Sequence, residues 1–224
     1  MSATLSLMLL ASVLPFAAVE ETAPRTVLWA GHQVSYGSRR IPFRGRVKTR
    51  SESLLLARVR FDGTRLHVSQ IACAVFFDEV AGARVSVDAD ALPRSNMTFN
   101  LRADGDGYGA GSEVAWGAED IDDDGHPGMT VSVDAPVCAG DLYVSNRSLT
   151  RSVGRFEAKR FVGDARVTVH QHVLGARGRC LETFADDTLE NVRGPFAYVE
   201  IPAGTTCGDL IRKGWPVDAE TPDS

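Results

Sequence analysis

Apolar and polar residues alternate with a period of two along most of the chain. Between Phe43 and Phe61, odd-numbered positions carry mostly apolar or small side chains, and even-numbered positions carry mostly charged ones. Successive side chains of a β-strand point to opposite faces of a sheet, so this pattern predicts antiparallel strands that bury one face. These nineteen residues exceed the usual length of one strand, and we therefore predict a hairpin at the polar stretch 49–53.

Turn signals divide the rest of the chain into further strands. Asp62-Gly63 predicts a tight turn, because this pair accepts the positive φ angles of a type I′ turn, and a strand follows over 64–77. Alternation between other turns predicts additional strands near 27–36, 83–87, 97–102, 113–116, 129–135, 141–148, 153–162, 165–174, 179–184 and 196–202. The one predicted helix is short and spans 207–214. The sequence therefore predicts an all-β fold.

A meander of this many strands must protect its edge strands from pairing with other chains. An antiparallel meander that forms a closed or nearly closed barrel does so most simply, and a two-sheet β-sandwich is the alternative. We predict a single all-β domain over residues 24–216 and a disordered polar tail over 217–224. The strand pattern resembles that of lipocalin-like barrels of the calycin type, although their G-x-W motif is missing and the nearest stretch is LWAGHQ around Trp29. The interior of such a barrel could hold a small apolar or amphipathic ligand.

The N-terminal segment contains an apolar run from Leu5 to Val19. This run is too short to span a bilayer and resembles the hydrophobic region of a secretory signal. We therefore predict that residues 1–23 are a signal peptide and that the protein is secreted or periplasmic; a buried N-terminal helix is the alternative. No later segment is long and apolar enough to predict a transmembrane helix.

The cysteines also favour export. The chain has four, at Cys73, Cys138, Cys180 and Cys207, and none forms a C-x-x-C pair of the kind that binds zinc. An even number of widely spaced cysteines predicts two disulfides in an oxidising compartment, with buried free thiols as the alternative. We predict the pairs Cys180–Cys207, which closes a short loop between late strands, and Cys73–Cys138.

Charge argues against a nucleic-acid partner. The formal net charge is −5, and no row of aromatic residues alternates with basic ones. The charge is distributed in blocks: residues 39–70 carry nine basic and two acidic side chains, whereas residues 78–141 carry three basic and fourteen acidic ones. We expect the opposite blocks to lie beside each other in the fold, since strands close in sequence usually neighbour in space.

The most distinctive short motif is AEDIDDDGHPGMTVSV, residues 118–133. Asp120, Asp122 and Asp124 alternate and are followed by Gly125, which suits a sharp turn. Three carboxylates at this spacing can converge on one hard cation such as Ca²⁺, which takes oxygen ligands. The alternative is a solvated acidic turn. A second acidic stretch, with Asp104 and Asp106 among glycines, predicts a flexible turn.

The motif resembles the D-x-D-x-D-G calcium loops of EF-hands and of FG-GAP β-propeller repeats. The resemblance implies that the three aspartates bind Ca²⁺ through their side chains and His126 through its backbone carbonyl. Two positions depart from these families: Gly128 replaces the acid usual at the ninth position of an FG-GAP loop, and Val131 replaces the glutamate at the twelfth of an EF-hand. We therefore expect weak, structural calcium binding.

A second possible metal site lies in VTVHQHV, where His170 and His172 share one face of a predicted strand. Paired histidines bind zinc and iron in many β-folds, and a third ligand could come from His32 or His67. No nucleophile motif or phosphate-binding loop is present. The sequence thus favours an exported binding or structural module over an enzyme, and a metal-dependent enzyme using His170 and His172 is the alternative.

Overall fold

The computed structural model of the protein describes residues 25–41, 45–136 and 138–220. Residues 1–23, the predicted signal peptide, lie outside these ranges. The elements, in chain order, are β1 (Arg25–Ile41), β2 (Gly45–Asp62), β3 (Arg65–Phe77), β4 (Arg84–Val87), β5 (Ser95–Leu101), β6 (Tyr108–Trp116), β7 (Met129–Asp134), β8 (Gly140–Glu157), β9 (Arg160–Arg177), α1 (Arg179–Phe184), β10 (Thr188–Ile201) and α2 (Cys207–Lys213). Among the described residues, no helix is long and apolar enough to cross a membrane.

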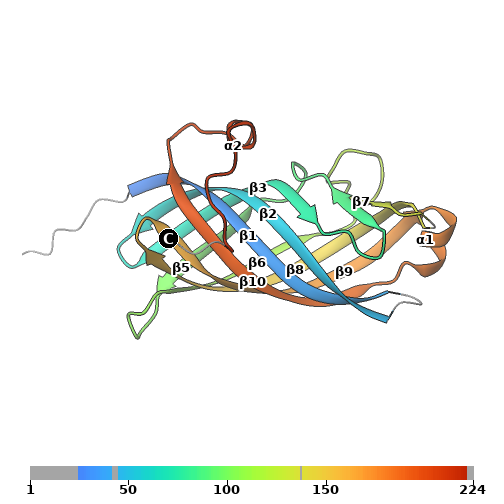
Figure 1. The fold of residues 1–224 in the computed structure, drawn as a ribbon, viewed down its shortest axis with the longest axis horizontal. Coiled ribbons are helices and arrows are strands. Elements are labelled where there is room, and N and C mark those ends of the chain that lie inside the picture. Colours follow the sequence, from blue (N-terminus) through green and yellow to red (C-terminus); the bar gives the residue numbers. More distant parts are fainter. Residues whose placement is uncertain (1–24, 42–44, 137, 221–224) are drawn as a thin grey trace, which may run out of the picture.

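Eight of the strands form a closed antiparallel ring (Figure 1). The hydrogen-bonded order is β1-β2-β3-β5-β6-β8-β9-β10, and β10 pairs with β1 to complete it. The remaining strands, β4 and β7, pair with each other, and β7 continues this small extension onto the first residues of β8. Neighbours in the ring therefore follow one another along the chain, which confirms the predicted all-β meander barrel.

The barrel strands are longer than the sequence suggested. β2 is one strand of 18 residues, so the predicted hairpin at 49–53 is wrong. The pairing with β1 continues without a break from Arg25–Phe61 to Ile41–Gly45. β8 is likewise one strand, where the sequence predicted two strands near 141–148 and 153–162. In β2, Ser51 and Ser53 of this stretch pair with Ser35 and Gln33 of β1 and face the barrel interior, whereas Arg50 and Glu52 lie on the outer face.

Aromatic rings fill the end of the barrel where β1 begins. Trp29, Phe99, Phe161, Phe196 and Tyr198 are each at most 5% exposed. The Phe161 ring centroid lies 5.1 Å from that of Phe99 and 5.6 Å from that of Trp29. Tilted and edge-to-face ring contacts of this kind add to the stability gained from burying the rings. We call this cluster the aromatic plug.

Two glycines allow the plug to pack against the barrel wall. A Cβ atom on Gly31 would lie 2.2 Å from the Tyr198 ring, and one on Gly163 would lie 2.6 Å from the Phe196 ring. Both distances are shorter than van der Waals contact, so a larger residue at either position would push a plug ring out of place.

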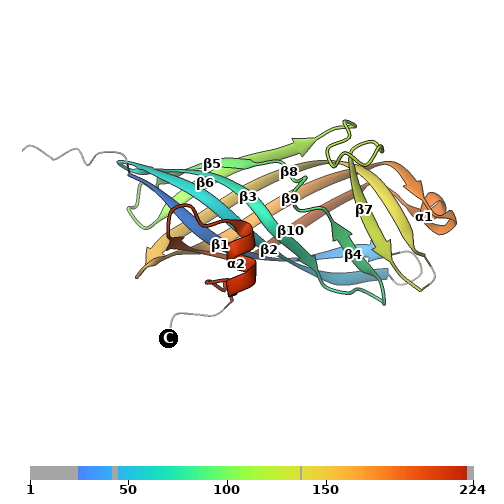
Figure 2. The same ribbon diagram turned by 90° about the horizontal axis from the view of Figure 1, so that it is seen from above.

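All four cysteines form disulfides, but the predicted pairing is wrong. The bonds are Cys73–Cys207 and Cys138–Cys180, each with a Cα–Cα distance of 5.3 Å. The predicted helix is confirmed as α2, which lies outside the barrel wall after the chain folds back from β10 (Figure 2), and Cys207 there bonds to β3. Residues 179–184, predicted as a strand, form α1, and Cys180 in this helix bonds to the segment before β8.

Candidate functional site

The inner face of the barrel changes from apolar to polar beyond the aromatic plug. On β1, the alternation that places Trp29 inside continues with Gln33 and Ser35. These residues pair in register with Ser53 and Ser51 of β2, so hydroxyl and amide groups line this part of the wall. This polar half explains why the sequence resembled a turn at 49–53.

An inner cavity of about 240 Å³ lies next to the plug. It opens because the barrel wall is incomplete there: β3 pairs with β5 only over Arg65–Gln70, and β5 pairs with β6 at only two positions. Apolar and uncharged polar side chains line the cavity, namely Leu55, Gln70, Ile71, Ala72, Leu92, Pro93, Ser95, Val114, Trp116, Asn146 and Ser148. The cavity can therefore accept a small molecule that has both apolar and neutral polar parts.

A buried hydrogen bond joins the plug to the inner cavity. The Tyr198 hydroxyl donates to Gln70 Oε1 over 2.6 Å, and the two residues are 5% and 7% exposed. Burial raises the pKa of the Tyr198 hydroxyl above its ordinary range, so this group stays protonated and can donate. Gln70 is therefore held in a fixed orientation on the cavity wall.

A second, outer hollow of about 780 Å³ adjoins the cavity near the ends of β6, β8, β9 and β10. Trp116 and Asn146 line both spaces, so the two hollows are neighbours. The Trp116 indole is fixed between them, because its Nε1 donates to the Val144 carbonyl over 2.9 Å. Unlike the inner cavity, the outer hollow carries charged groups, including Glu119 and Arg147.

The predicted histidine pair lies in the wall of the outer hollow. His170 and His172 both line it, and His172 Nδ1 lies 2.6 Å from Asp187 Oδ2. The other Asp187 oxygen accepts the backbone N–H of Val173 over 2.9 Å. That backbone bond, followed by the His172 contact, holds the pKa of Asp187 below its ordinary value.

The structure does not bring a third histidine to this pair. His32 lies on β1, opposite Ala197 of β10, and His67 lies on β3, where its Nδ1 is 3.1 Å from Thr98 Oγ1. Over residues 25–41, 45–136 and 138–220, the only group of three or more His, Cys, Asp or Glu side chains that could share a metal ion is the acidic loop. Metal binding by the histidine pair therefore remains a prediction.

The acidic loop does gather its three carboxylates. Asp120, Asp122 and Asp124 can place one oxygen each within 4.8 Å of the others. Asp122 Oδ1 is buried and has no hydrogen-bond partner among the described residues, while its Oδ2 accepts the backbone N–H of Thr130 over 2.7 Å. A buried oxygen of this kind suits a cation ligand.

Hydrogen bonds inside the loop fix its shape. The Asp120 carboxylate accepts the backbone N–H groups of Asp124 and Gly125 over 3.2 and 2.8 Å, and Gly125 takes the turn at φ 86°. The Thr130 hydroxyl bond to Asp124 is the main cause that holds the pKa of this carboxyl below its ordinary value. The His126 ring stacks on Tyr143, with 4.1 Å between ring centroids.

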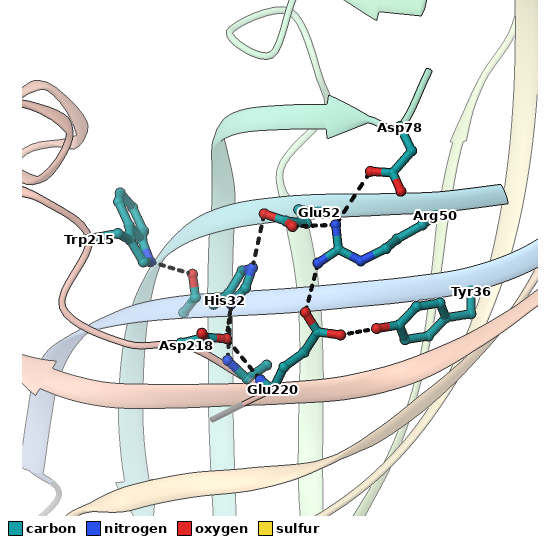
Figure 3. Close-up of polar contacts among 10 residues, drawn as sticks. His32, Tyr36, Arg50, Glu52, Asp78, Trp215, Asp218 and Glu220 are labelled. Carbon is teal, nitrogen blue, oxygen red and sulfur yellow. Dashed lines mark hydrogen bonds and ion pairs between the residues drawn. The ribbon is translucent and has the colours of Figure 1, made fainter. Parts of the chain in front are cut away.

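A third polar cluster, which the sequence did not indicate, lies on the outer wall (Figure 3). Residues 215–220, here called the C-terminal strap, cross β1 and cover His32, whose side chain is 8% exposed. The Trp215 Nε1 donates to the Gly31 carbonyl over 3.0 Å, and the Ala219 N–H donates to His32 Nδ1 over 3.0 Å. Because Nδ1 accepts this bond, the neutral ring carries its proton on Nε2, which lies 3.6 Å from Glu52 Oε2.

Arg50 connects the far end of the strap to the barrel. Its Nη2 lies 2.7 Å from Glu220 Oε2, its Nη1 lies 3.4 Å from Asp78 Oδ1, and it also contacts Glu52. Glu220 also accepts a hydrogen bond from the Tyr36 hydroxyl. The contact of Arg50 with Asp78 joins the basic block 39–70 to the acidic block 78–141, as the charge pattern predicted. Residues 217–220 of the predicted polar tail 217–224 thus contact the barrel wall, and residues 221–224 lie outside the described residues.

The fold and these sites define a meander barrel whose interior is filled by aromatic rings at one end and lined by polar side chains beyond them. Comparison with protein-family models, with curated proteins and with solved structures finds no match. The functional argument therefore depends on the chemistry of the hollows and the acidic loop.

Proposed function

We propose that this protein is a binding module that holds a small amphipathic ligand in the inner cavity of its barrel. The observation that carries the proposal is the cavity itself, an open hollow of about 240 Å³ that uncharged apolar and polar side chains line next to a filled plug. Small-molecule sites have this composition: mostly apolar walls with a few polar groups that fix orientation. Trp116 supplies an aromatic wall, and Gln70 supplies a polar contact.

Neighbouring β8 positions provide the test, because Ser148 lines the cavity and Leu149 is 39% exposed on the outer face. Ser148→Phe should fill the cavity, whereas Leu149→Phe adds the same ring outside it. Two-dimensional NMR titration with ethylbenzene and benzamide, two small aromatic probes, should shift resonances of Trp116 and Val114 in the natural protein and in Leu149→Phe. Ser148→Phe should lose these shifts while keeping the same strand resonances. The proposal fails if neither probe shifts the cavity resonances of the natural protein.

We also infer that the acidic loop binds Ca²⁺ and stabilises the start of β7. The convergence of three carboxylates and the unpartnered Asp122 Oδ1 support this inference. Ca²⁺ takes six to eight oxygens, and the three aspartates supply only part of this set, so we expect affinity of about 10⁻⁴–10⁻³ M. The loop would then act as a structural element beside the barrel.

Export is the third part of the proposal. Both disulfides support it, because such bonds persist in oxidising compartments and are rare in the cytosol. The apolar run in the predicted signal peptide is the matching feature of the sequence. Ligand binding would then take place in the periplasm or outside the cell.

A further inference from the structure

Gln70 is a buried side chain with an unused hydrogen-bond donor. It is 7% exposed and lines the inner cavity, and its Oε1 is occupied by the Tyr198 hydroxyl. Its Nε2 forms no hydrogen bond with another described residue and is not a fully buried atom, so it is accessible from the cavity. The amide group is planar, so the bond to Oε1 fixes the direction of both N–H groups.

The other amide of the cavity wall is occupied by its neighbour. Asn146 Nδ2 donates to Ser148 Oγ over 3.0 Å, and the Ser148 hydroxyl lies 3.4 Å from Asn146 Oδ1. Because Asn146 and Ser148 already bond to each other, they depend less on a hydrogen-bond acceptor from a ligand than Gln70 Nε2 does. A ligand acceptor at Gln70 Nε2 would replace a water contact with a direct hydrogen bond, which gives a modest net gain in affinity.

The charge distribution restricts the ligand further. The residues that line the inner cavity include no ionisable side chain, whereas Glu119, Arg147 and Asp187 line the adjoining outer hollow. A ligand charge placed in the inner cavity would gain no counter-charge from the side chains that line it. The lining therefore favours a ligand whose inserted part is neutral.

We propose that the inner cavity selects small neutral molecules that carry a carbonyl oxygen or a similar acceptor, which receives the N–H of Gln70. This inference rests on the proposed function and names its ligand class. Trp116 and the aliphatic wall enclose the apolar body of the molecule, and Gln70, held by Tyr198, binds its acceptor. An aromatic amide has this composition, whereas an aromatic hydrocarbon lacks the acceptor and an aromatic carboxylate adds a charge.

The experiment is an NMR titration of the ¹⁵N-labelled protein with benzamide, ethylbenzene and benzoate. Benzamide should shift the side-chain Nε2 resonance of Gln70, which is a direct readout in the unaltered protein. Gln70→Leu should weaken benzamide binding about tenfold, the ratio expected for one neutral hydrogen bond, and leave ethylbenzene binding unchanged. Gln33→Leu replaces an inner-face amide that does not line the cavity, and it should alter neither. Benzoate should bind at least about tenfold more weakly than benzamide.

The outcomes separate this inference from the proposed function. If benzamide and ethylbenzene bind but Gln70→Leu affects both equally, the inner cavity binds ligands and Gln70 does not select them. If benzoate binds as tightly as benzamide, the neutrality argument is overturned. If no probe shifts any cavity resonance, the proposed function itself fails. If Gln70→Leu does not fold, the shift of the Gln70 Nε2 resonance in the natural protein on adding benzamide still tests the inference, and the absence of that shift contradicts it.

Discussion

The disulfide Cys73–Cys207 ties the end of the chain to the barrel wall, and removing it should have both a global and a local effect. It joins β3 to the first residue of α2, after which the C-terminal strap runs to β1. A cross-link stabilises the folded state by limiting the conformations of the unfolded chain, and the effect grows with the length of the closed loop.

The two disulfides close loops of very different length, which gives an internal comparison. The sequence separation is 134 residues for Cys73–Cys207 and 42 for Cys138–Cys180. The loop-entropy relation converts these separations to about 5 and about 4 kcal/mol of unfolding free energy. For a domain of this size, each kcal/mol corresponds to about 2–4 °C in melting temperature. The longer link should therefore contribute more, although it lies on the outer wall.

The assay uses the paired variants Cys73→Ala/Cys207→Ala and Cys138→Ala/Cys180→Ala, with urea unfolding followed by tryptophan fluorescence. The first pair should lose more stability than the second. The local effect is tested with trypsin, which cleaves after Arg212 and Lys213 of α2. Cleavage there should accelerate in the first variant, because α2 is no longer tied to β3, and should stay slow in the second.

A specific result would refute this reasoning. If the second variant is the less stable one, loop length does not govern the contribution of these bonds. If trypsin cleaves α2 equally in both variants, the strap contacts alone hold the segment against the barrel. Non-reducing peptide mapping that joins Cys73 to Cys138 or Cys180 would contradict the pairing itself.

Three further predictions follow from the loop, the plug and the N-terminal segment. Calcium at ten times its dissociation constant should stabilise the protein by about 1.4 kcal/mol, measured as a higher melting temperature with calcium than with chelator. Asp122→Ala should abolish this calcium response, whereas Asp104→Ala, in the other acidic turn, should keep it. If both variants keep the full response, the loop is an acidic turn that binds no calcium. Replacing Phe161, which is 1% exposed, by alanine should lower the free energy of unfolding in urea by about 3–5 kcal/mol. Replacing Phe156, which is 45% exposed, by alanine should lower it by less than about 2 kcal/mol. Equal decreases would contradict the central position of Phe161 in the plug. Protein exported by a bacterial host should lack roughly its first 20 residues by intact mass; an exported form that retains them would exclude a cleaved signal.

The barrel could be predicted because its strands follow one another along the chain. Each strand buries one face, and this face appears in the sequence as alternation, while Asp62-Gly63 marks the turn between β2 and β3. The acidic loop could be predicted for the same reason, since the hydrogen bonds from Asp120 reach only four and five residues ahead. Local spacing was sufficient for the turn at Asp62-Gly63 and for the acidic loop, but not for α1, a local helix that was predicted as a strand.

The inner cavity and the strap could not be predicted, because their contacts join distant parts of the chain. Tyr198 and Gln70 are 128 residues apart, and Ala219 and His32 are 187 residues apart. The prediction of strand length was wrong for a different reason. A polar inner face looks like a turn when only alternation is considered, and stretch 49–53 was misread in this way.

The contrast between the two halves of the barrel is itself an argument for ligand binding. The aromatic plug buries large rings and so supplies stability to the whole ring of strands. The other half could have been closed with aliphatic side chains, yet its inner face carries serines and amides such as Gln33, Ser51 and Ser148. Some of these groups bond to one another, as Gln33 does to Ser35 and Asn146 to Ser148, and such pairs stabilise the fold less than a filled apolar core would. A wall that is uncharged inside, charged at the adjoining hollow and open where β5 separates from β6 is the arrangement expected if a small neutral molecule completes the interior.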